Sequence, residues 1–296
     1  MPELPEVETV RRDLSEYLVG VRFTTIKFID FKNVAPAAAF LARYLKGAAI
    51  IALRRRGKLL IFDLEKAGKT DKHLLFHLKM TGQLIFARGK ELKAGGHSLI
   101  GKNLMDSIGG KLPNKYTRAY FEFDSGGCLY FNDLRKFGYI RLVGTEELDK
   151  ILKNDYGPEP MDKEFTAEWL SSLVAKRTAP IKSVILNQKL IAGLGNIYAD
   201  ESLFLAKINP QRPANTLKPA EVKELHKAII TIINRAIKAR GTTFRNYVDA
   251  NGKKGSYINF LQVYGRDKLS CYRCGRTIRK IKVGGRGTHY CGYCQK

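Results

Sequence analysis

The sequence is short of acidic residues and has no long apolar run. A membrane-spanning helix needs about 20 consecutive apolar residues, so we expect none in this chain. The N-terminus has no positively charged segment followed by an apolar stretch, so we expect no secretory signal and place the protein in the cytoplasm. Disulfide bonds are not expected in that compartment.

The shortage of acid leaves a large positive charge. Asp and Glu number 28 against 52 Lys and Arg, which gives a formal net charge of +24 at pH 7. This exceeds what solubility requires and favours a polyanionic partner, with nucleic acid as the first candidate. The alternative is a solvated basic surface without a partner. A membrane surface is less favoured, because no basic amphipathic helix with an aromatic face stands out.

The first half of the chain predicts a two-layer β-sandwich. A helix is expected near residues 5–18, where Pro5 suits the first turn and acidic residues suit the positive end of the helix dipole. Short segments rich in β-branched and aromatic residues then follow, at 21–29, 58–65, 73–80 and in "RAYFEFD" and "CLYFND". Residues 88–116 are rich in Gly and Lys without a clear period, which predicts a long exposed loop.

The second half predicts helices and a small basic module. Residues 146–162 read as a linker, and from residue 163 helical spacing dominates. Gly193 and Gly195 mark a tight turn between a helix ending near Asn187 and one beginning near Asn196, a helix-two-turn-helix arrangement whose N-terminal amides suit a phosphate. The expected fold class is α+β, with domains at 1–145, 163–256 and 257–296.

The cysteine spacing is the strongest motif. A C-x2-C pair, a 16-residue spacer and a second C-x2-C pair supply four thiolates for one structural Zn²⁺, at Cys271, Cys274, Cys291 and Cys294. Two disulfides or an iron–sulfur cluster are the alternatives. Glycines between the pairs predict a β-hairpin with Arg286 at its tip, either as a phosphate contact or as an ordinary surface arginine.

Three separated motifs resemble those of one family. "PELPEVE" at the N-terminus, "GLGNIYADE" in the middle, and "VYGR" followed by the cysteine module with "GGRGT" are similar, in that order, to bacterial formamidopyrimidine-DNA glycosylase. The resemblance covers nearly the whole chain apart from residues 88–116. It implies a β-sandwich domain and a helical domain with a zinc-ribbon hairpin.

The resemblance also implies the catalytic residues. Removal of Met1 would leave Pro2 as a secondary amine that attacks the sugar C1′, displaces the damaged base and forms an iminium. An α-amino group has a pKa of about 8 in model peptides, so part of it is neutral and reactive near pH 7. Glu3 would be the adjacent acid and base, Glu6 a supporting carboxylate, and Lys58 and Arg286 contacts to phosphates flanking the lesion.

Further residues are implied in DNA binding. A glycosylase that extrudes its base has to fill the space left behind, and Met80, Arg135 and Phe137 match the family's void-filling residues. Lys136, Lys182 and Asn196 are similar to phosphate contacts. Where the family has a phosphate-contacting histidine just before an F-x-F strand, this sequence departs from it and has Tyr116 and Arg118. Residues 241–256 correspond to a loop that caps the extruded base.

We therefore expect a monomeric bacterial enzyme that binds double-stranded DNA in a cleft between its domains and removes oxidised purines. It would act as both a glycosylase and an abasic-site lyase, with β- and δ-elimination. Two alternatives stay open: an endonuclease VIII-like enzyme for oxidised pyrimidines, and a non-catalytic zinc-ribbon DNA-binding protein.

Overall fold

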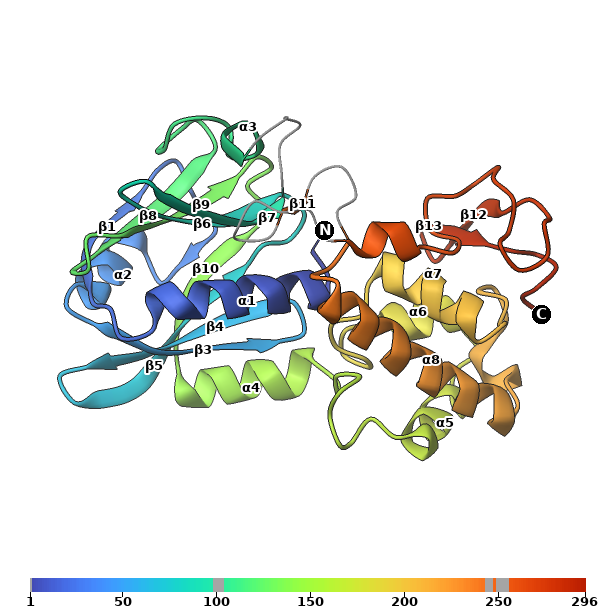
Figure 1. Ribbon diagram of the computed structural model, residues 1–296. Coiled ribbons are helices and arrows are strands. Elements are labelled where there is room, and N and C mark those ends of the chain that lie inside the picture. Colours follow the sequence, from blue (N-terminus) through green and yellow to red (C-terminus); the bar gives the residue numbers. More distant parts are fainter. Residues whose placement is uncertain (1, 98–103, 243–246, 249–255) are drawn as a thin grey trace. The chain divides into compact units, whose positions relative to one another are not determined.

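A computed structural model describes residues 2–97, 104–242, 247–248 and 256–296. The chain divides into two compact units (Figure 1). The first comprises Met1–Leu152 with Ala239–Ile258, and the second comprises Lys153–Lys238 with Asn259–Lys296. The described residues 239–242 and 256 thus lie with the N-terminal unit, whereas the sequence groups them with the helices.

The first unit is a two-layer β-sandwich. One sheet has the order β1-β8-β9-β6-β7-β11, and the other has the order β2-β10-β5-β4-β3. The strands of the six-stranded sheet are β1 (Phe23–Phe28), β6 (Gly82–Arg88), β7 (Glu91–His97), β8 (Thr117–Phe123), β9 (Cys128–Asp133) and β11 (Tyr247–Val248). Those of the five-stranded sheet are β2 (Val34–Ala35), β3 (Ala49–Arg56), β4 (Leu59–Lys66), β5 (Lys69–His77) and β10 (Tyr139–Gly144). Tightly packed rings such as Phe62, Phe76 and Phe121 fill the space between the layers, which confirms the predicted sandwich.

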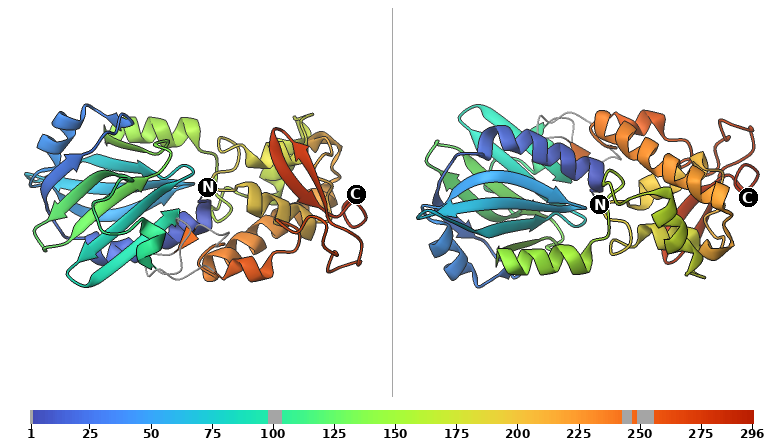
Figure 2. Two further views of the ribbon diagram at one scale, coloured as in Figure 1. Left: turned by 90° about the horizontal axis from the view of Figure 1, so that it is seen from above. Right: turned by 90° about the horizontal axis from the view of Figure 1, so that it is seen from below.

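Helices cover the edges of this sandwich. Helix α1 (Leu4–Leu18) contacts β3 of one sheet and β7 of the other, and its apolar side Val7, Val10, Leu14 and Leu18 is buried. Helix α4 (Thr145–Asp155) lies on the opposite side of the five-stranded sheet from α1 (Figure 2). The shorter α2 (Ala38–Leu45) contacts β1 and β2. The helical spacing read at 5–18 is therefore confirmed.

The expectation of a long loop over residues 88–116 is wrong for much of that stretch. Strand β7 pairs with β6 along its length, and a short helix α3 (Leu104–Ile108) buries Ile108 against Ile85 and Ala94. Two of the glycines that suggested a loop, Gly95 and Gly96, serve close packing instead. A Cβ on Gly95 would lie 2.5 Å from Cγ2 of Val10, so only glycine lets β7 approach α1 this closely. Residues 98–103 lie outside the described part of the chain.

The second unit is helical with a terminal β-hairpin. Its helices are α5 (Ala167–Ala175), α6 (Ile181–Leu186), α7 (Asn196–Leu205) and α8 (Pro219–Lys238), with 3-10 turns η1 (Ala214–Thr216) and, at the junction of the units, η2 (Tyr257–Phe260). Strands β12 (Arg279–Val283) and β13 (Arg286–Tyr290) form the hairpin. Helix α6 ends and α7 begins where the glycine turn predicted.

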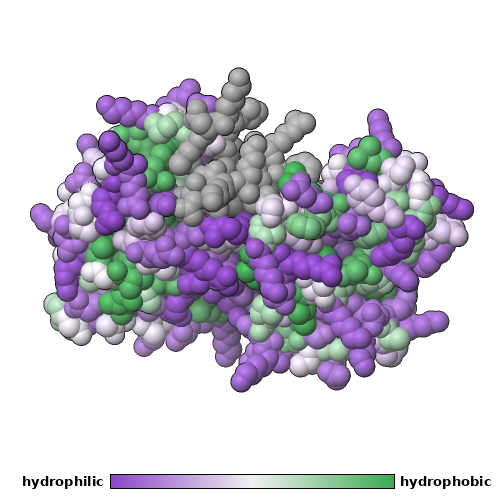
Figure 3. Space-filling view, viewed as in Figure 1, coloured by the Kyte–Doolittle hydropathy of each residue, from purple (hydrophilic) through white to green (hydrophobic). Residues whose placement is uncertain are grey.

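On the face shown in Figure 3, hydrophilic residues (purple) separate smaller hydrophobic areas (green). Within the described residues, no helix has both the length and the apolar character needed to cross a membrane.

Candidate functional site

The N-terminal end of α1 is a buried cluster of the residues expected in catalysis. Pro2, Glu3 and Glu6 are all buried. Glu6 accepts hydrogen bonds with both carboxylate oxygens, from the Glu3 N–H at 2.9 Å and from the Thr242 N–H at 2.7 Å. Gly241 has φ +82°, and a Cβ there would lie 2.7 Å from Glu6 Oε1. Glu6 thus connects the start of α1 to the start of the 241–256 segment.

Most of that segment, expected to cap the extruded base, lies outside the described residues. The described parts of the segment are hydrogen-bonded within the first unit. Strand β11 pairs with β7, and the Ser256 N–H donates to the Ala239 carbonyl at 3.0 Å. Arg240 next to it forms an ion pair with Asp13 on α1 at 2.5 Å.

A second acid on α1 fixes the hairpin that carries Lys58. Glu8 binds the guanidinium groups of Arg11 at 2.9 Å, Arg12 at 2.7 Å and Arg55 at 3.0 Å. Burial favours the neutral carboxyl, but the three arginines outweigh it and lower the pKa of Glu8 to about 2. Because Arg55 belongs to β3, this cluster holds α1 against the β3–β4 turn, where Lys58 is 4% exposed.

His77 stands beside Leu59 across the β4–β5 pair. Burial, with the positive charges of Lys79 and Lys58, lowers the pKa of His77 to about 3, so its ring is neutral near pH 7. Nδ1 accepts the Lys79 N–H at 2.9 Å, which places the ring proton on Nε2. This geometry fits a buried structural group, and a neutral N–H donor near Lys58 also suits an anion.

The three void-filling candidates come together on one surface of the first unit. Met80 is 41% exposed and Phe137 is 50% exposed, although hydropathy alone would place both in the core. Arg135 joins them: its Nη1 lies 3.3 Å from Met80 Sδ, and its Cζ lies 4.5 Å from the centroid of the Phe137 ring. An exposed cluster of two apolar side chains and a cation suits insertion into a base stack.

A buried acid that the sequence reading missed organises this surface. Asp133 has no exposed surface and accepts hydrogen bonds from the Gly138 N–H at 2.7 Å, the Arg135 N–H at 3.2 Å and the Thr81 hydroxyl. The Arg118 Nε in turn donates to the Asp133 carbonyl at 2.9 Å. The available signal was an acid directly before "LRKFG" in a strongly basic chain.

The neighbouring DNA-contact candidates differ in exposure. Lys136 is exposed at this turn and forms an ion pair with Asp30. That ammonium, by hydrogen bond and charge, lowers the pKa of Asp30. Tyr116 is half-buried, and its carbonyl accepts the Asp133 N–H at 2.9 Å, so its main chain belongs to the support of the turn.

In the second unit, Lys182 does not have the position expected for a phosphate contact. Its side chain is fully buried, and Nζ lies 2.6 Å from Asp200 Oδ1, 2.8 Å from Thr288 Oγ1 and 3.2 Å from the Gly287 carbonyl oxygen. A buried ammonium keeps its charge only when paired and hydrogen-bonded in this way. Asn196 also turns inward, because its Nδ2 donates to the same Gly287 carbonyl at 2.9 Å. Both residues hold the strand that begins at the exposed Arg286.

Two adjacent acids on α7 explain why distant motifs occur together. Asp200 accepts the His289 N–H at 2.8 Å, in addition to its ion pair with Lys182. Glu201 is 1% exposed and accepts the N–H groups of Gln262, Val263 and Tyr264, each at 2.9 Å. Burial raises the pKa of Glu201. The three N–H groups oppose this rise, and the charge of the neighbouring Asp200 adds to it. The acids of the "GLGNIYADE" motif therefore hold both the "VYGR" segment and the hairpin that precedes the last two cysteines.

The four cysteines form a candidate metal centre. Their sulfur atoms all lie within 4.8 Å of one another. A tetrahedral zinc with Zn–S bonds of about 2.3 Å holds its sulfurs about 3.8 Å apart, so the donor set fits one structural zinc and leaves no open position. Burial opposes ionisation of Cys291, but hydrogen bonds from the Cys294 and Tyr293 N–H groups and neighbouring thiols lower its pKa to about 7. Burial, with hydrogen bonds to Cys274 and Cys291, raises the pKa of Cys294 to about 12. The cluster therefore favours one thiolate, and zinc binding has to displace the other protons.

Comparisons with known proteins agree with this architecture. Residues 1–140 match the formamidopyrimidine-DNA glycosylase N-terminal domain, residues 156–248 its H2TH domain, and residues 270–296 a zinc finger found in FPG and IleRS. The formamidopyrimidine-DNA glycosylases of Pelotomaculum thermopropionicum and Streptococcus pneumoniae serotype 4 are 41% and 38% identical, each over 100% of this chain and 99% of theirs.

Solved structures extend the similarity to the fold. A Lactococcus lactis FPG mutant complexed with Fapy-dG-containing DNA is similar at TM-score 0.87 and 38% identity, covering 100% of both chains. The Lactococcus lactis Fpg complexed with abasic-site DNA is similar at TM-score 0.86 and 38% identity, covering 99% of both. Together with the buried N-terminal cluster, the exposed Met80–Arg135–Phe137 surface and the four-cysteine centre, these similarities show that the chain belongs to the formamidopyrimidine-DNA glycosylase family.

Proposed function

We propose that this protein is a bifunctional DNA glycosylase and abasic-site lyase that removes oxidised purines, including formamidopyrimidines and 8-oxoguanine, from double-stranded DNA. The observation that carries the proposal is the buried Pro2–Glu3 pair at the start of α1, in a chain that matches this family over its full length. The Lactococcus lactis relatives were solved with Fapy-dG or abasic DNA, which supports the same substrate class here.

Pro2 is the proposed nucleophile. Once Met1 is removed, the neutral proline nitrogen forms a bond to C1′ while the C1′–base bond breaks and the base leaves with the electron pair and takes up a proton. The new ammonium at Pro2 gives up its N–H proton, so that its electron pair is free to form the C=N bond as the sugar ring opens. Glu3 supplies a proton to the sugar ring oxygen, the ring opens, and a cationic iminium remains between Pro2 and C1′.

The iminium then makes strand cleavage possible. Loss of a C2′ proton to a base sends electrons towards the iminium and expels the 3′ phosphate, and a second elimination expels the 5′ phosphate. Water finally releases the sugar fragment from Pro2 and regenerates the free amine.

The neighbouring residues have supporting roles in the proposal. Both oxygens of Glu6 already accept main-chain N–H groups, so Glu6 is a positioning residue that sets the start of α1. Lys58 and the exposed Arg286 balance the charge of the flanking phosphates as they leave. Lys182 and Asn196 act on DNA indirectly, through the main chain next to Arg286.

Binding of the extruded state rests on the Met80–Arg135–Phe137 cluster. Phe137 is proposed to insert between base pairs, Met80 to fill the space of the extruded base, and Arg135 to hydrogen-bond the unpaired base opposite. Lys136 and Tyr116 border this surface. The four-cysteine zinc holds the hairpin that presents Arg286 and takes no part in the chemistry.

The decisive test is borohydride trapping of the Met1-processed protein on a duplex with 8-oxoguanine opposite cytosine. We expect a covalent adduct that maps to residue 2, and its loss or marked decline in Pro2→Gly. The same trap on abasic and oxidised-pyrimidine duplexes separates the alternatives. Adduct on the pyrimidine duplex alone would favour an endonuclease VIII-like enzyme, and tight binding without an adduct on any duplex would leave a non-catalytic DNA-binding protein.

The proposed setting is the bacterial cytoplasm, since the relatives named above are bacterial and a four-thiolate zinc centre is stable where thiols stay reduced.

A further inference from the structure

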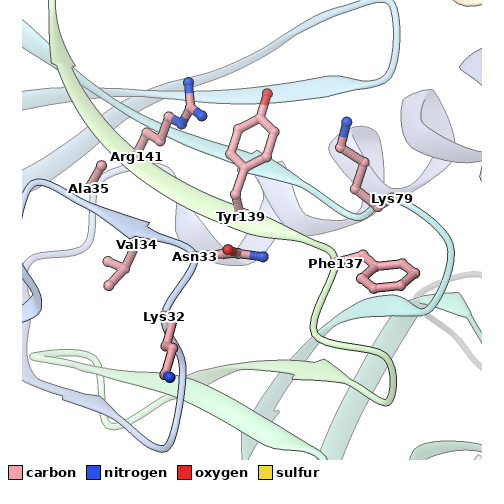
Figure 4. A pocket seen from close by; sticks show the side chains of 8 residues that line it. All are labelled: Lys32, Asn33, Val34, Ala35, Lys79, Phe137, Tyr139 and Arg141. Carbon is pink, nitrogen blue, oxygen red and sulfur yellow. The ribbon is translucent and has the colours of Figure 1, made fainter.

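A basic pocket lies next to the void-filling surface, on the first unit. It has a volume of about 410 Å³, and Phe137 forms part of its wall (Figure 4). The other lining residues are Lys32, Asn33, Val34, Ala35, Lys79, Tyr139 and Arg141. Three of the eight carry a positive charge and none carries a negative one. The pocket is therefore suited to an anion, and none of the roles assigned above uses it.

The cations stand in a row with aromatic rings. Tyr139 and Arg141 are two residues apart on β10 and so project to one side of the strand, and Phe137 lines the pocket from the turn before it. The Tyr139 ring lies between two cations, with Lys79 Nζ 5.7 Å and Arg141 Cζ 4.7 Å from its centroid (Figure 4). Arg135 stands over Phe137 in the same manner. The row continues the void-filling surface without a break.

The walls of the pocket are fixed in advance. Strand β2 pairs with β10, which places Ala35 opposite Arg141. Asn33 donates from Nδ2 to the Lys136 carbonyl at 2.8 Å and accepts the Ile140 N–H at its own carbonyl at 3.0 Å. Asp30, an acid near Lys32, is ion-paired with Lys136 and does not line the pocket. The main chain that carries Lys32 and Arg141 is thus held in place before a ligand arrives.

We infer that this pocket binds backbone phosphates of the DNA strand opposite the lesion, beyond the unpaired base. The inference rests on the proposed function, which places Arg135 at that base and Phe137 beside it. The next groups along the row, Lys79, Tyr139 and Arg141, then follow the same strand. A strand presents a phosphate at every nucleotide, which matches cations on both sides of one ring better than a single small anion does.

The pocket variant Lys32→Ala/Arg141→Ala tests this inference on a duplex with a stable abasic-site analogue. The matched control is Lys27→Ala/Lys69→Ala, which removes two exposed charges from strands of the same unit. We expect the pocket variant to raise Kd about tenfold or more at 0.1 M salt and to reduce the slope of log K against log salt by ~1.8, because each phosphate contact contributes ~0.9. The control should change Kd less than twofold. Equal behaviour of the two variants would overturn the inference.

Neutral methylphosphonate linkages identify the strand. Placed opposite the lesion, at successive positions to one side, they should weaken binding by the wild-type protein and cause no further loss in the pocket variant. The same pattern on the lesion strand would overturn the strand assignment. Borohydride trapping by the wild-type protein on the lesion duplex reports the proposed function separately, so a failed pocket and a failed glycosylase give different results.

Discussion

The buried pair of Lys182 and Asp200 allows a sharp test of the second unit. Neither side chain has exposed surface, and the charged atoms lie 2.6 Å apart. Lys182→Met would leave the Asp200 carboxylate buried without its cation, and removing one partner of such a pair costs about 3–5 kcal/mol. We expect a loss of that size in the free energy of unfolding, measured by urea titration. Removing both charges, in Lys182→Met/Asp200→Leu, should recover a large part of it.

The matched control is Lys189→Met. Lys189 pairs with Asp155 at 3.3 Å in the same unit, but the two side chains are 65% and 54% exposed. Solvent screens such a pair, so this change should cost less than about 1 kcal/mol. If both lysine variants unfold at the same urea concentration as the wild type, the burial reasoning fails.

DNA binding separates a buried support from a direct phosphate contact. Because Lys182 holds Gly287 and Thr288, it should act on DNA through the neighbouring Arg286. In a double-mutant cycle of Lys182→Met and Arg286→Ala, the double variant should then have a Kd for DNA little higher than that of whichever single variant binds DNA less tightly. Additive losses, with a salt slope reduced by ~1.8 in the double variant, would refute this reasoning and restore Lys182 as a phosphate contact.

Three other changes test separate parts of the molecule. Cys271→Ser should release zinc, disorder the β12–β13 hairpin and abolish DNA binding. The measurements are the zinc content of the purified variant and the fluorescence anisotropy of a labelled duplex. A zinc-free variant that binds normally would contradict the metal assignment. Glu8→Gln should cost about 3 kcal/mol at pH 7, because the native pKa of about 2 lies below the ordinary 4.5. That stability is present above pH 4.5 and is lost as the pH falls towards 2, so urea unfolding across this range should show the difference vanish; a constant difference would exclude the ionic cause. Asp133→Asn should weaken binding of an abasic duplex about tenfold, with no further loss when combined with Arg135→Ala; additive losses would mean that Asp133 acts elsewhere.

Patterns that depend on local spacing could be predicted from the sequence. The apolar side of α1, the helix ends at Leu186 and Asn196, and the metal-binding arrangement of the cysteines all follow from residues close together in the chain. Strand β7 could not be found this way, because the glycine at position 95 is required by close packing against Val10, more than eighty residues earlier in the chain.

Side-chain exposure was the other limit. A lysine in a basic chain looks the same in sequence whether it meets phosphate or, like Lys182, a buried aspartate. Met80 and Phe137 have the hydropathy of core residues, yet the short turns that carry them leave them exposed. Only the family resemblance distinguished them, whereas the sole sequence signal for the buried Asp133 was its position before "LRKFG".

The acids on α1 and α7 constrain the order in which the chain can fold. The partners of these acids are synthesised much later than the acids themselves. His289 follows Asp200 by 89 residues, Gln262 follows Glu201 by 61, and Thr242 follows Glu6 by 236. A nascent chain can form sheets and helices as it emerges, but Thr242 and His289 are both made in the last fifth of the protein, so Glu6 and Asp200 lack these two partners until then. A polypeptide released early would therefore lack both a finished N-terminal cluster and a finished hairpin, so incomplete synthesis should leave substrates for proteolysis rather than partial enzymes that occupy DNA.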